Sequence, residues 1–436
     1  MRCDVVVVGA GPAGLSAAVA AAPHRSVVVV DLAARPGGQF YRRPPGAPPI
    51  RLAAQAAALG VTMLSGRRVF LVEPGFTVHT DTEPVTADTV VIATGAHDRP
   101  VPFPGWDLPG VLTAGGAQAL LKGNRVLPGR RIVVAGTGPF LLPVGAGLAS
   151  AGADVAGVFE ANSPAGFARH PGVVARHPDK LVEAARHLAV LARHRVPVRH
   201  RHAVQAAHGT DQVTAVTVAK VDRDWRPVTG TERRIDCDTV AVGCGFVPQI
   251  DTGTALGCAT DLMAGTPALR VDDRQATTVP GVFAAGEVTG IGGVRLSLSE
   301  GRIAGLAASG VDTPAALLRR RNADRAFAVA LADVYPVRPG WLASLTGDTL
   351  LCRCEEVDHG TVRAAVTELG ARDARAVKLL TRAGMGWCQG RMCGDAVACV
   401  VADLTGGTAD PTDLNRRILA QPVRLRDLAN DNVEDR

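Results

Sequence analysis

A glycine motif near the N-terminus constrains the fold more than any other feature of this chain. An apolar run at residues 5–8 is followed by GAGPAG at residues 9–14 and then by an alanine-rich helical segment. This G-x-G-x-x-G spacing allows a tight turn, a close approach of the backbone to a pyrophosphate, and close packing of the helix on the strand. Asp31 ends the next apolar run, 17 residues after Gly14, where it can accept hydrogen bonds from a ribose. The segment therefore predicts a βαβ unit that holds a dinucleotide at a helix N-terminus.

The same pattern recurs in a degenerate form further along the chain. GTGPFL occupies residues 136–141, so that Leu141 stands where the third glycine is expected and should hold the helix farther from the strand. Glu160 follows the next strand, where it could bind a ribose of NAD and would repel the 2′-phosphate of NADP. Two interpretations of Gly136, Gly138 and Glu160 remain open. In the first they bind NAD or another adenine nucleotide, and in the second the fold is retained but its nucleotide site is empty.

Four of the nine cysteines form two close pairs near the C-terminus. Cys352 and Cys354 enclose one residue, and after 33 intervening residues Cys388 and Cys393 enclose four. An odd cysteine number in a chain of this length does not indicate a disulfide scaffold. Thiolates favour an iron–sulfur cluster or zinc over hard cations. Three alternatives remain at this point: a [2Fe-2S] cluster, a closed structural zinc site, and free thiols without a metal.

Charge and hydropathy exclude several classes of protein. The formal charge is +6, but the basic residues are scattered, and their tightest cluster, residues 319–321, has no interleaved aromatic residues. A nucleic-acid surface is therefore not expected. There is no run of 18 apolar residues, so we expect no transmembrane helix. The N-terminus enters a strand at once, without the pattern of a secretory signal, and we expect a cytoplasmic protein.

Three further segments distinguish FAD from NAD at the first unit, by resemblance. GGQ at 37–39, VIATG at 91–95 and PGVFAAGE at 280–287 match, in this order, segments of the two-dinucleotide-domain flavoprotein oxidoreductases. In that family the acidic residue of the last segment, here Glu287, contacts the ribityl chain of FAD. The resemblance implies that FAD is bound by Gly9, Gly11, Pro12, Ala13, Gly14, Asp31, Gly38, Gln39, Thr94, Gly95, Gly286 and Glu287.

The C-terminal cysteines are similar to those of the BFD-like [2Fe-2S] domain, in which the second pair encloses two residues rather than four. This similarity makes Cys352, Cys354, Cys388 and Cys393 the predicted cluster ligands. We predict an α/β fold with two Rossmann-like dinucleotide-binding domains and a small C-terminal helical domain that bears the cysteines. The expected limits are 1–115 with 270–311 for FAD, 116–269 for the second nucleotide, 312–345 for a linker, and 346–430 for the cluster.

The order of these segments resembles the large FAD subunit of the opine oxidase, hydrogen cyanide synthase and hydroxyproline/proline dehydrogenase group. In that group an oxidase-like flavoprotein subunit oxidises the amine, and a small ferredoxin-like subunit is sometimes added. The resemblance implies an FAD-dependent oxidoreductase. Its expected role is the electron-transfer subunit of an amino-acid, opine or imino-acid dehydrogenase that relays electrons between flavin and cluster.

The residues themselves leave an alternative open and identify no catalytic side chain. No redox-active cysteine pair occurs in the flavoprotein region, so thioredoxin-reductase-like chemistry is not expected. His97 and Arg99 follow the VIATG segment, but a surface or core role is the simpler interpretation. A self-contained NAD(P)H-dependent reductase remains the second hypothesis. Leu141 argues against it, because it weakens the nicotinamide site, and Glu160 argues for it.

Overall fold

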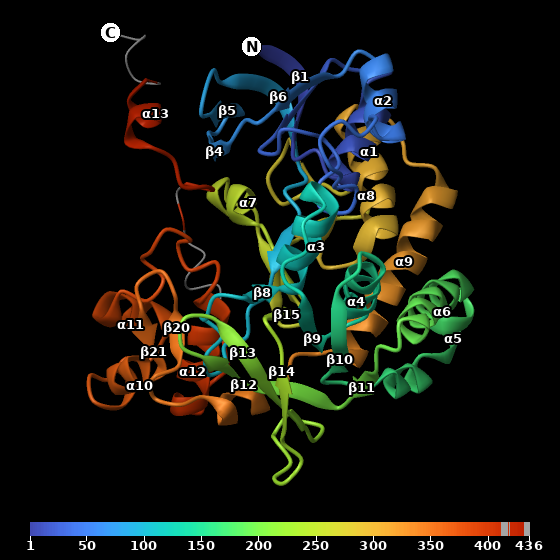
Figure 1. The fold of residues 1–436 in the computed structure, drawn as a ribbon. Coiled ribbons are helices and arrows are strands. Elements are labelled where there is room, and N and C mark those ends of the chain that lie inside the picture. The colour runs from blue at the N-terminus through green and yellow to red at the C-terminus, as the bar shows by residue number, and fades with distance from the viewer. Residues whose placement is uncertain (411–416, 418, 431–436) are drawn as a thin grey trace.

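The computed structural model describes residues 1–410, 417 and 419–430, and it builds them around two sheets with a small helical domain to one side (Figure 1). The first sheet has the order β3-β2-β1-β6-β5-β4, with β19 paired to β6. Its β1, β2, β3, β6 and β19 are parallel, as the continuous apolar runs predict. The strands are β1 Arg2–Val8, β2 Val27–Asp31, β3 Thr62–Ser65, β4 Val69–Val72, β5 Thr77–Thr80, β6 Val85–Ile92 and β19 Val282–Ala284.

Two helices of the first half pack backbone to backbone. Helix α1 (Pro12–Ala21) follows the glycine turn, and α8 (Gly293–Ala308) lies against it. A Cβ atom at Gly301 would lie 2.1 Å from the Ala13 carbonyl oxygen, and one at Gly305 would lie 2.2 Å from that of Ala17. Only glycine fits at these positions. The close approach joins the N-terminal unit to the segment after β19, some 280 residues later in the chain.

The second sheet is entirely parallel and has the order β11-β10-β9-β15-β8. A three-stranded antiparallel sheet, β12-β13-β14, packs beside it. The strands are β8 Val111–Thr113, β9 Arg131–Thr137, β10 Asp154–Glu160, β11 Val198–His200, β12 His202–Gly209, β13 Val213–Lys220, β14 Arg233–Asp236 and β15 Thr239–Cys244. The helices of the two halves are α2 Arg51–Ala58, α3 Ala114–Asn124, α4 Leu141–Ser150, α5 Pro171–Ala175, α6 Pro178–Arg193 and α7 Asp251–Ala255.

Short elements connect the two halves. Strands β7 (Ala96–Asp98) and β16 (Phe246–Pro248) pair with each other, and β17 (Thr260–Met263) pairs with β18 (Thr266–Leu269). The stretch predicted as a linker contains the 20-residue helix α9 (Ala315–Val334), which packs on α8 and α5. Three 3₁₀ turns complete this part: η1 Pro164–Arg169, η2 Glu287–Thr289 and η3 Pro339–Ser344.

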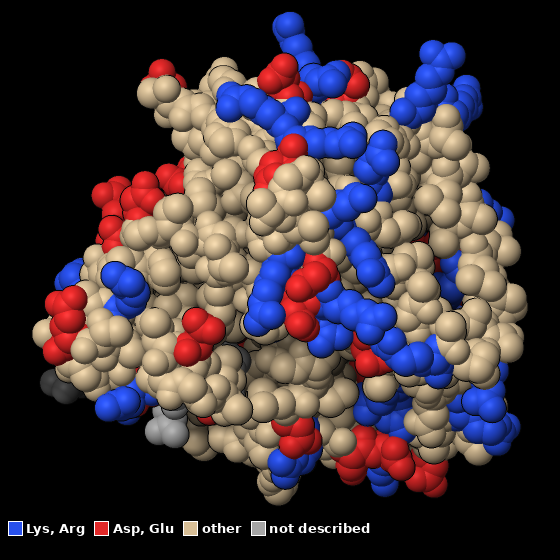
Figure 2. Space-filling model, turned by 90° about the horizontal axis from the view of Figure 1, so that it is seen from below, with Lys and Arg blue, Asp and Glu red and all other residues tan. Residues whose placement is uncertain are grey.

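The small C-terminal domain has a short hairpin and several helices around an apolar core. Its elements are β20 Leu350–Cys352, β21 Val357–Asp358, α10 His359–Thr367, α11 Ala374–Thr381 and α12 Gly394–Thr405. Helix α13 (Leu425–Asn430) follows near the C-terminus. Among the described residues, no helix is long and apolar enough to cross a membrane. Figure 2 shows basic side chains interspersed with acidic ones on the face seen from below.

Candidate functional site

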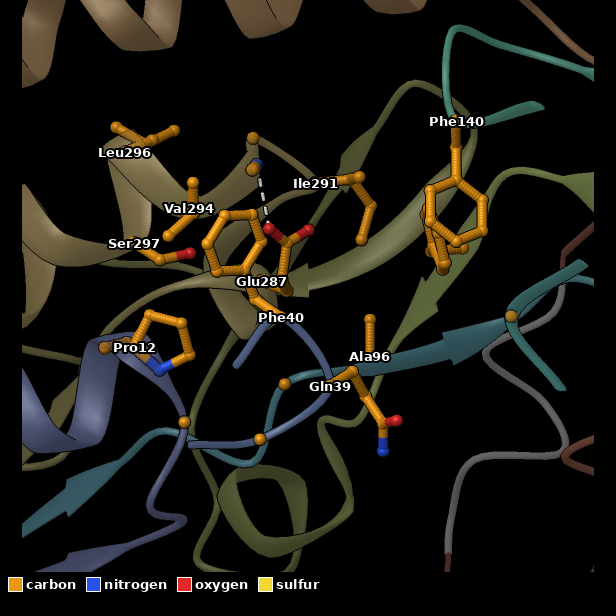
Figure 3. Close-up of a pocket in the computed structure, with 18 of the residues that line it drawn as sticks. Pro12, Gln39, Phe40, Ala96, Phe140, Glu287, Ile291, Val294, Leu296 and Ser297 are labelled. Carbon is orange, nitrogen blue, oxygen red and sulfur yellow. Dashed lines mark hydrogen bonds between the residues drawn. The ribbon is translucent and has the colours of Figure 1, made fainter. Parts of the chain in front are cut away.

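One large cavity of about 2590 Å³ extends along both glycine turns and between the two halves. Ten of the twelve residues predicted to bind FAD line it; Gly14 and Gly286 lie behind its wall. Figure 3 shows Glu287 among the labelled side chains, with Phe40 and Ile291 beside it and Phe140 of the second unit farther away. Of the three residues predicted for the second nucleotide, only Gly138 lines the cavity.

The first glycine turn has the geometry that a bound pyrophosphate needs. Gly9 has φ of +106°, and a Cβ there would lie 2.3 Å from the Ala93 carbonyl oxygen. A Cβ at Gly14 would lie 1.8 Å from the carbonyl oxygen of Gly9, so the helix could not start so close to the strand. No atom lies within 4 Å of the corresponding position at Gly11, which faces the cavity. The turn is closed by packing on one side and open on the side where phosphates would approach.

Asp31 is fixed at the edge of this turn by backbone donors. Its Oδ2 accepts a hydrogen bond from the Ala10 N–H, and its Oδ1 accepts one from the Ala33 N–H at 2.6 Å. Burial raises the pKa of Asp31, and these two N–H donors oppose the rise. The carboxylate is thus oriented at the end of β2, at the cavity wall, as a ribose acceptor must be.

A buried acidic residue that sequence reasoning missed supports the turn carrying Glu287. Glu300 of α8 is fully buried and accepts 2.9 Å hydrogen bonds from the Gly286 N–H and the Thr289 hydroxyl. It also forms an ion pair with Arg325 of α9. Its only sequence signal is a glutamate in a helix that is otherwise apolar or small on its buried face. Glu300 therefore holds η2 in place from behind.

Glu287 itself extends from η2 into the cavity. Its Oε1 accepts a 2.8 Å hydrogen bond from the Gly293 N–H at the start of α8 (Figure 3). Desolvation raises the pKa of Glu287 to about 7, against the effect of backbone donors. A carboxyl group in this position can accept hydrogen bonds from ligand hydroxyl groups along the cavity wall.

The second glycine unit keeps the acidic residue but not the helix start. Glu160 is buried, and its Oε2 and Oε1 accept 2.8 Å hydrogen bonds from the N–H groups of Gly138 and Asn162. Desolvation raises its pKa to about 7. Helix α4 begins five residues after Gly136, whereas α1 begins three residues after Gly9. The helix N-terminus therefore lies farther from the glycine turn than in the first unit.

Leu141 is accommodated by a glycine on the neighbouring strand. Its side chain is buried, and a Cβ atom at Gly243 of β15 would lie 3.2 Å from its Cδ2 atom. The same Cβ would lie 2.9 Å from that of Ala114. The leucine thus belongs to the core of the second half, and the structure of this unit does not require a bound nucleotide.

The four C-terminal cysteines of the two motifs lie close to one another. Cys352 is hydrogen-bonded to Cys393, which lowers the pKa of the Cys352 thiol to about 5 and raises that of Cys393. Burial raises the pKa of the Cys354 thiol, and the neighbouring Cys388 raises it further. The Gly384 N–H donates to the Cys352 sulfur at 3.5 Å.

This donor set suits a cluster that shares two iron atoms among four thiolates. Among the residues that the structure describes, no group of three or more histidine, cysteine or carboxylate side chains is already arranged around a metal position. Four thiolates are also the ligands of a closed structural zinc site, so the donor set by itself is compatible with either metal centre. The other five cysteines do not join the group. Four of them are buried and one is partly buried, and desolvation raises the pKa of each: Cys3, Cys237, Cys244, Cys258 and Cys399.

Strand β7, which follows the VIATG segment, connects the cavity to the loop between Cys388 and Cys393. His97 of β7 lines the cavity, and its Nε2 donates to the carbonyl oxygen of Arg391 at 3.1 Å. Its Nδ1 is buried and has no protein partner among the described residues. Arg99 forms a 2.9 Å ion pair with Asp395, two residues after Cys393. Both side chains thus join the two parts of the chain, a role that sequence reasoning did not assign to them.

A buried carboxylate strengthens the same junction. Asp251 of α7 accepts from Arg391 at 3.2 Å and forms an ion pair with Arg417. Arg417 also donates to the Gln389 carbonyl oxygen at 2.8 Å. The side chains of all three charged residues are at most 14% exposed. The loop between Cys388 and Cys393 is therefore held against the flavoprotein half on two sides.

Comparisons with known proteins agree with this architecture. A model of the pyridine nucleotide-disulphide oxidoreductase family matches residues 3–307, and one of the BFD-like [2Fe-2S] binding domain matches residues 350–403. The first match implies FAD and the second implies the cluster, so both cofactor predictions are confirmed, whereas a nucleotide at the second unit stays a prediction. The roles of the individual residues also remain predictions.

The relatives include components of two multi-subunit enzymes. Hydrogen cyanide synthase subunit HcnB of Pseudomonas protegens is 34% identical, with 90% of each chain covered. An opine oxidase subunit of Agrobacterium tumefaciens is 33% identical over 98% of this chain and 91% of the relative. The structure of L-proline dehydrogenase from P. horikoshii has a TM-score of 0.69 at 20% identity, covering 98% of this chain and 79% of that one, which shows a shared fold. This chain belongs to the pyridine nucleotide-disulphide oxidoreductase family and is an FAD-dependent oxidoreductase with a BFD-like [2Fe-2S] domain at its C-terminus.

Proposed function

We propose that this chain is the electron-transfer subunit of a multi-subunit dehydrogenase that oxidises an amino acid, an opine or an imino acid on another subunit. The names of its relatives, which are subunits of hydrogen cyanide synthase and of opine oxidase, support this division of labour. The partner proposed for substrate oxidation is an oxidase-like flavoprotein subunit. We further propose a cytoplasmic location, since free, unpaired cysteines suit a reducing compartment.

The observation that carries the proposal is the junction at His97. This residue lines the cavity on one side and is hydrogen-bonded to the loop between Cys388 and Cys393 on the other. FAD supplies two-electron chemistry and a [2Fe-2S] cluster supplies one-electron chemistry, so a relay needs both groups close together on one rigid body. The ion pairs of Asp251 with Arg391 and Arg417 supply that rigidity.

Individual residues of the chain would divide the work as follows. The first glycine turn and Asp31 would orient the pyrophosphate and ribose of FAD, and Glu287 would accept from its ribityl hydroxyls. The four cysteines of the two motifs would hold the cluster, with the Gly384 N–H stabilising charge on the Cys352 sulfur. Buried Glu300 would keep the Glu287 turn in register.

A self-contained NAD(P)H-dependent reductase is the second candidate, because Glu160 and Gly138 retain the ribose-site geometry. An anaerobic titration of the purified holoprotein with NADH, followed at the flavin and iron–sulfur absorbance bands, separates the two candidates. If the chain receives its electrons from another subunit, stoichiometric NADH should bleach neither band, whereas dithionite should bleach both. Prompt bleaching by NADH would contradict it and support the reductase.

A further inference from the structure

An exposed apolar surface lies beside the second cysteine pair. Trp387, next to Cys388, is 76% exposed, and on α11 Leu379 is 67% and Leu380 is 50% exposed. Single exposed apolar residues are common, but a tryptophan with two leucines at one end of a small domain is typical of an interaction site. Tryptophan in particular contributes strongly to binding at protein interfaces. Figure 1 shows α11 on the outer side of the C-terminal domain, away from both sheets.

The exposed apolar residues lie beside Cys354 and Cys388, the two more accessible cysteines of the group. Cys354 is exposed, and a Cβ atom at Gly386 would lie 2.3 Å from the Cys354 Cβ. Trp387 follows directly and precedes Cys388. On the other side of Cys354, Glu355 forms a 2.8 Å ion pair with Arg382 at the end of α11. The apolar side chains therefore adjoin the side of the cysteine group that an external electron acceptor could approach.

Helix α11 is basic, because it contains Arg375 and Lys378 and no acidic residue. Arg382, just beyond its end, is neutralised by the ion pair with Glu355. Asp373 caps α11 by accepting from the Ala376 N–H at 2.7 Å. Arg375 and Leu379 stand four residues apart in α11 and so share one face of the helix. We name the whole surface the cluster-side face, comprising Trp387, Leu379, Leu380, Arg375, Lys378 and Arg382.

We infer that the cluster-side face docks an acidic electron-transfer protein that carries its own one-electron centre. The inference rests on the proposed function and deepens it by naming where electrons leave the chain and to what kind of partner. Negative charge on the partner complements the basic helix, and its apolar patch covers Trp387. A reduced cluster held by the four cysteines would supply one electron to the partner's oxidised centre and would itself be oxidised by one electron, with no bond formed or broken. A second copy fits poorly, because a twofold contact would set this basic face against itself.

Zero-length cross-linking tests the location, because the chain has only four lysines. An acidic plant-type [2Fe-2S] ferredoxin serves as the probe, and carbodiimide joins its carboxylates to lysines of the holoprotein, with the products mapped by mass spectrometry. Lys378 should be the linked residue, and Lys378→Arg should abolish the link while electron transfer to the ferredoxin persists. Exposed Lys220 on β13 is the internal comparison. Cross-links at Lys220, or none at Lys378, would overturn the inference.

The rate of electron transfer from dithionite-reduced holoprotein to the ferredoxin, measured by stopped flow after removal of excess reductant, gives a second test. Arg375→Glu should lower the second-order rate constant about tenfold at low ionic strength, with the difference vanishing in high salt. Trp387→Ala should lower it about fivefold with an unchanged cluster spectrum, as expected for an interface anchor. Arg193→Glu, at the end of α6, is the matched charge control and should leave the rate unchanged.

Equal rates in all variants, an equal loss in the α6 control, or faster transfer to basic cytochrome c than to the acidic ferredoxin would refute the docking site. A change of oligomeric state on Trp387→Ala would assign the face to a second copy instead. Failure of the proposed function is distinguishable, because it appears as bleaching by NADH, which none of these variants alters. The cross-link map remains interpretable in that case.

Discussion

Replacing Glu300, which does not itself line the cavity, should loosen the turn that carries Glu287. In Glu300→Ala, the Gly286 N–H and the Thr289 hydroxyl lose their acceptor while they remain buried, and Arg325 loses its ion partner. Both hydrogen bonds are accepted by a carboxylate, and hydrogen bonds to charged groups contribute about 1.5–3 kcal/mol each. The predicted loss is therefore about 3–5 kcal/mol, the range seen when one member of a buried ion pair is removed.

The assay follows local unfolding rather than a global transition, because a chain with several domains need not unfold in two states. Release of FAD, seen as a rise in flavin fluorescence, is recorded against urea for the holoprotein and each variant. Glu300→Ala should release FAD at a clearly lower urea concentration. Glu300→Gln, which keeps one acceptor oxygen but loses the charge, should lie between it and the unmodified protein. The control is Glu232→Ala, at an exposed loop position.

Equal release midpoints for Glu300→Ala and the exposed control would refute this reasoning. So would a large shift for Glu300→Gln with none for Glu300→Ala, since the argument depends on unsatisfied donors rather than on side-chain volume. An altered flavin spectrum without any change in midpoint would mean that the turn has a role in tuning the cofactor and not in holding it.

Three further outcomes are predicted. Cys354→Ser should abolish the iron–sulfur absorbance and lower the iron content, whereas Cys399→Ser should retain both, as measured by chemical iron analysis and visible spectroscopy. The pKa of Glu160 is raised to about 7 from 4.5, so the folded form binds more protons between these values and stability should fall as pH rises across that window; Glu160→Gln should flatten the pH dependence of the unfolding midpoint. Asp251→Ala should destabilise the junction by about 3–5 kcal/mol, because two arginines lose a buried partner, and proteolysis between the two parts should accelerate.

Local patterns predicted the first half of the molecule well. The turn at Gly9 depends mostly on the spacing of its glycines and on the acidic end of β2, which lie within about 25 residues of each other. The continuous apolar runs likewise predicted parallel strands in both sheets. The cysteine spacing predicted a metal centre, and the match to the BFD-like [2Fe-2S] binding domain confirms the cluster, while the four individual ligands stay a prediction.

Features that depend on distant parts of the chain were not predictable in the same way. A connecting helix was expected within the predicted linker, but not that α9 would pack through the buried charged residues Arg321 and Asp324. The role of His97 depends on a carbonyl group 294 residues away, and no local pattern encodes that distance. The leucine at the third glycine position packs against Gly243, about 100 residues later, and no local pattern indicated that contact.

Electrons should pass directly between the flavin and the cluster within one chain, across the junction at His97. Laser-flash reduction of the flavin in anaerobic holoprotein, with the cluster band followed in time, tests it most directly. The account predicts that the flavin signal decays as the cluster band bleaches, at a rate independent of protein concentration and slowed in Asp251→Ala. Decay without bleaching of the cluster band, or a rate proportional to protein concentration, would contradict it.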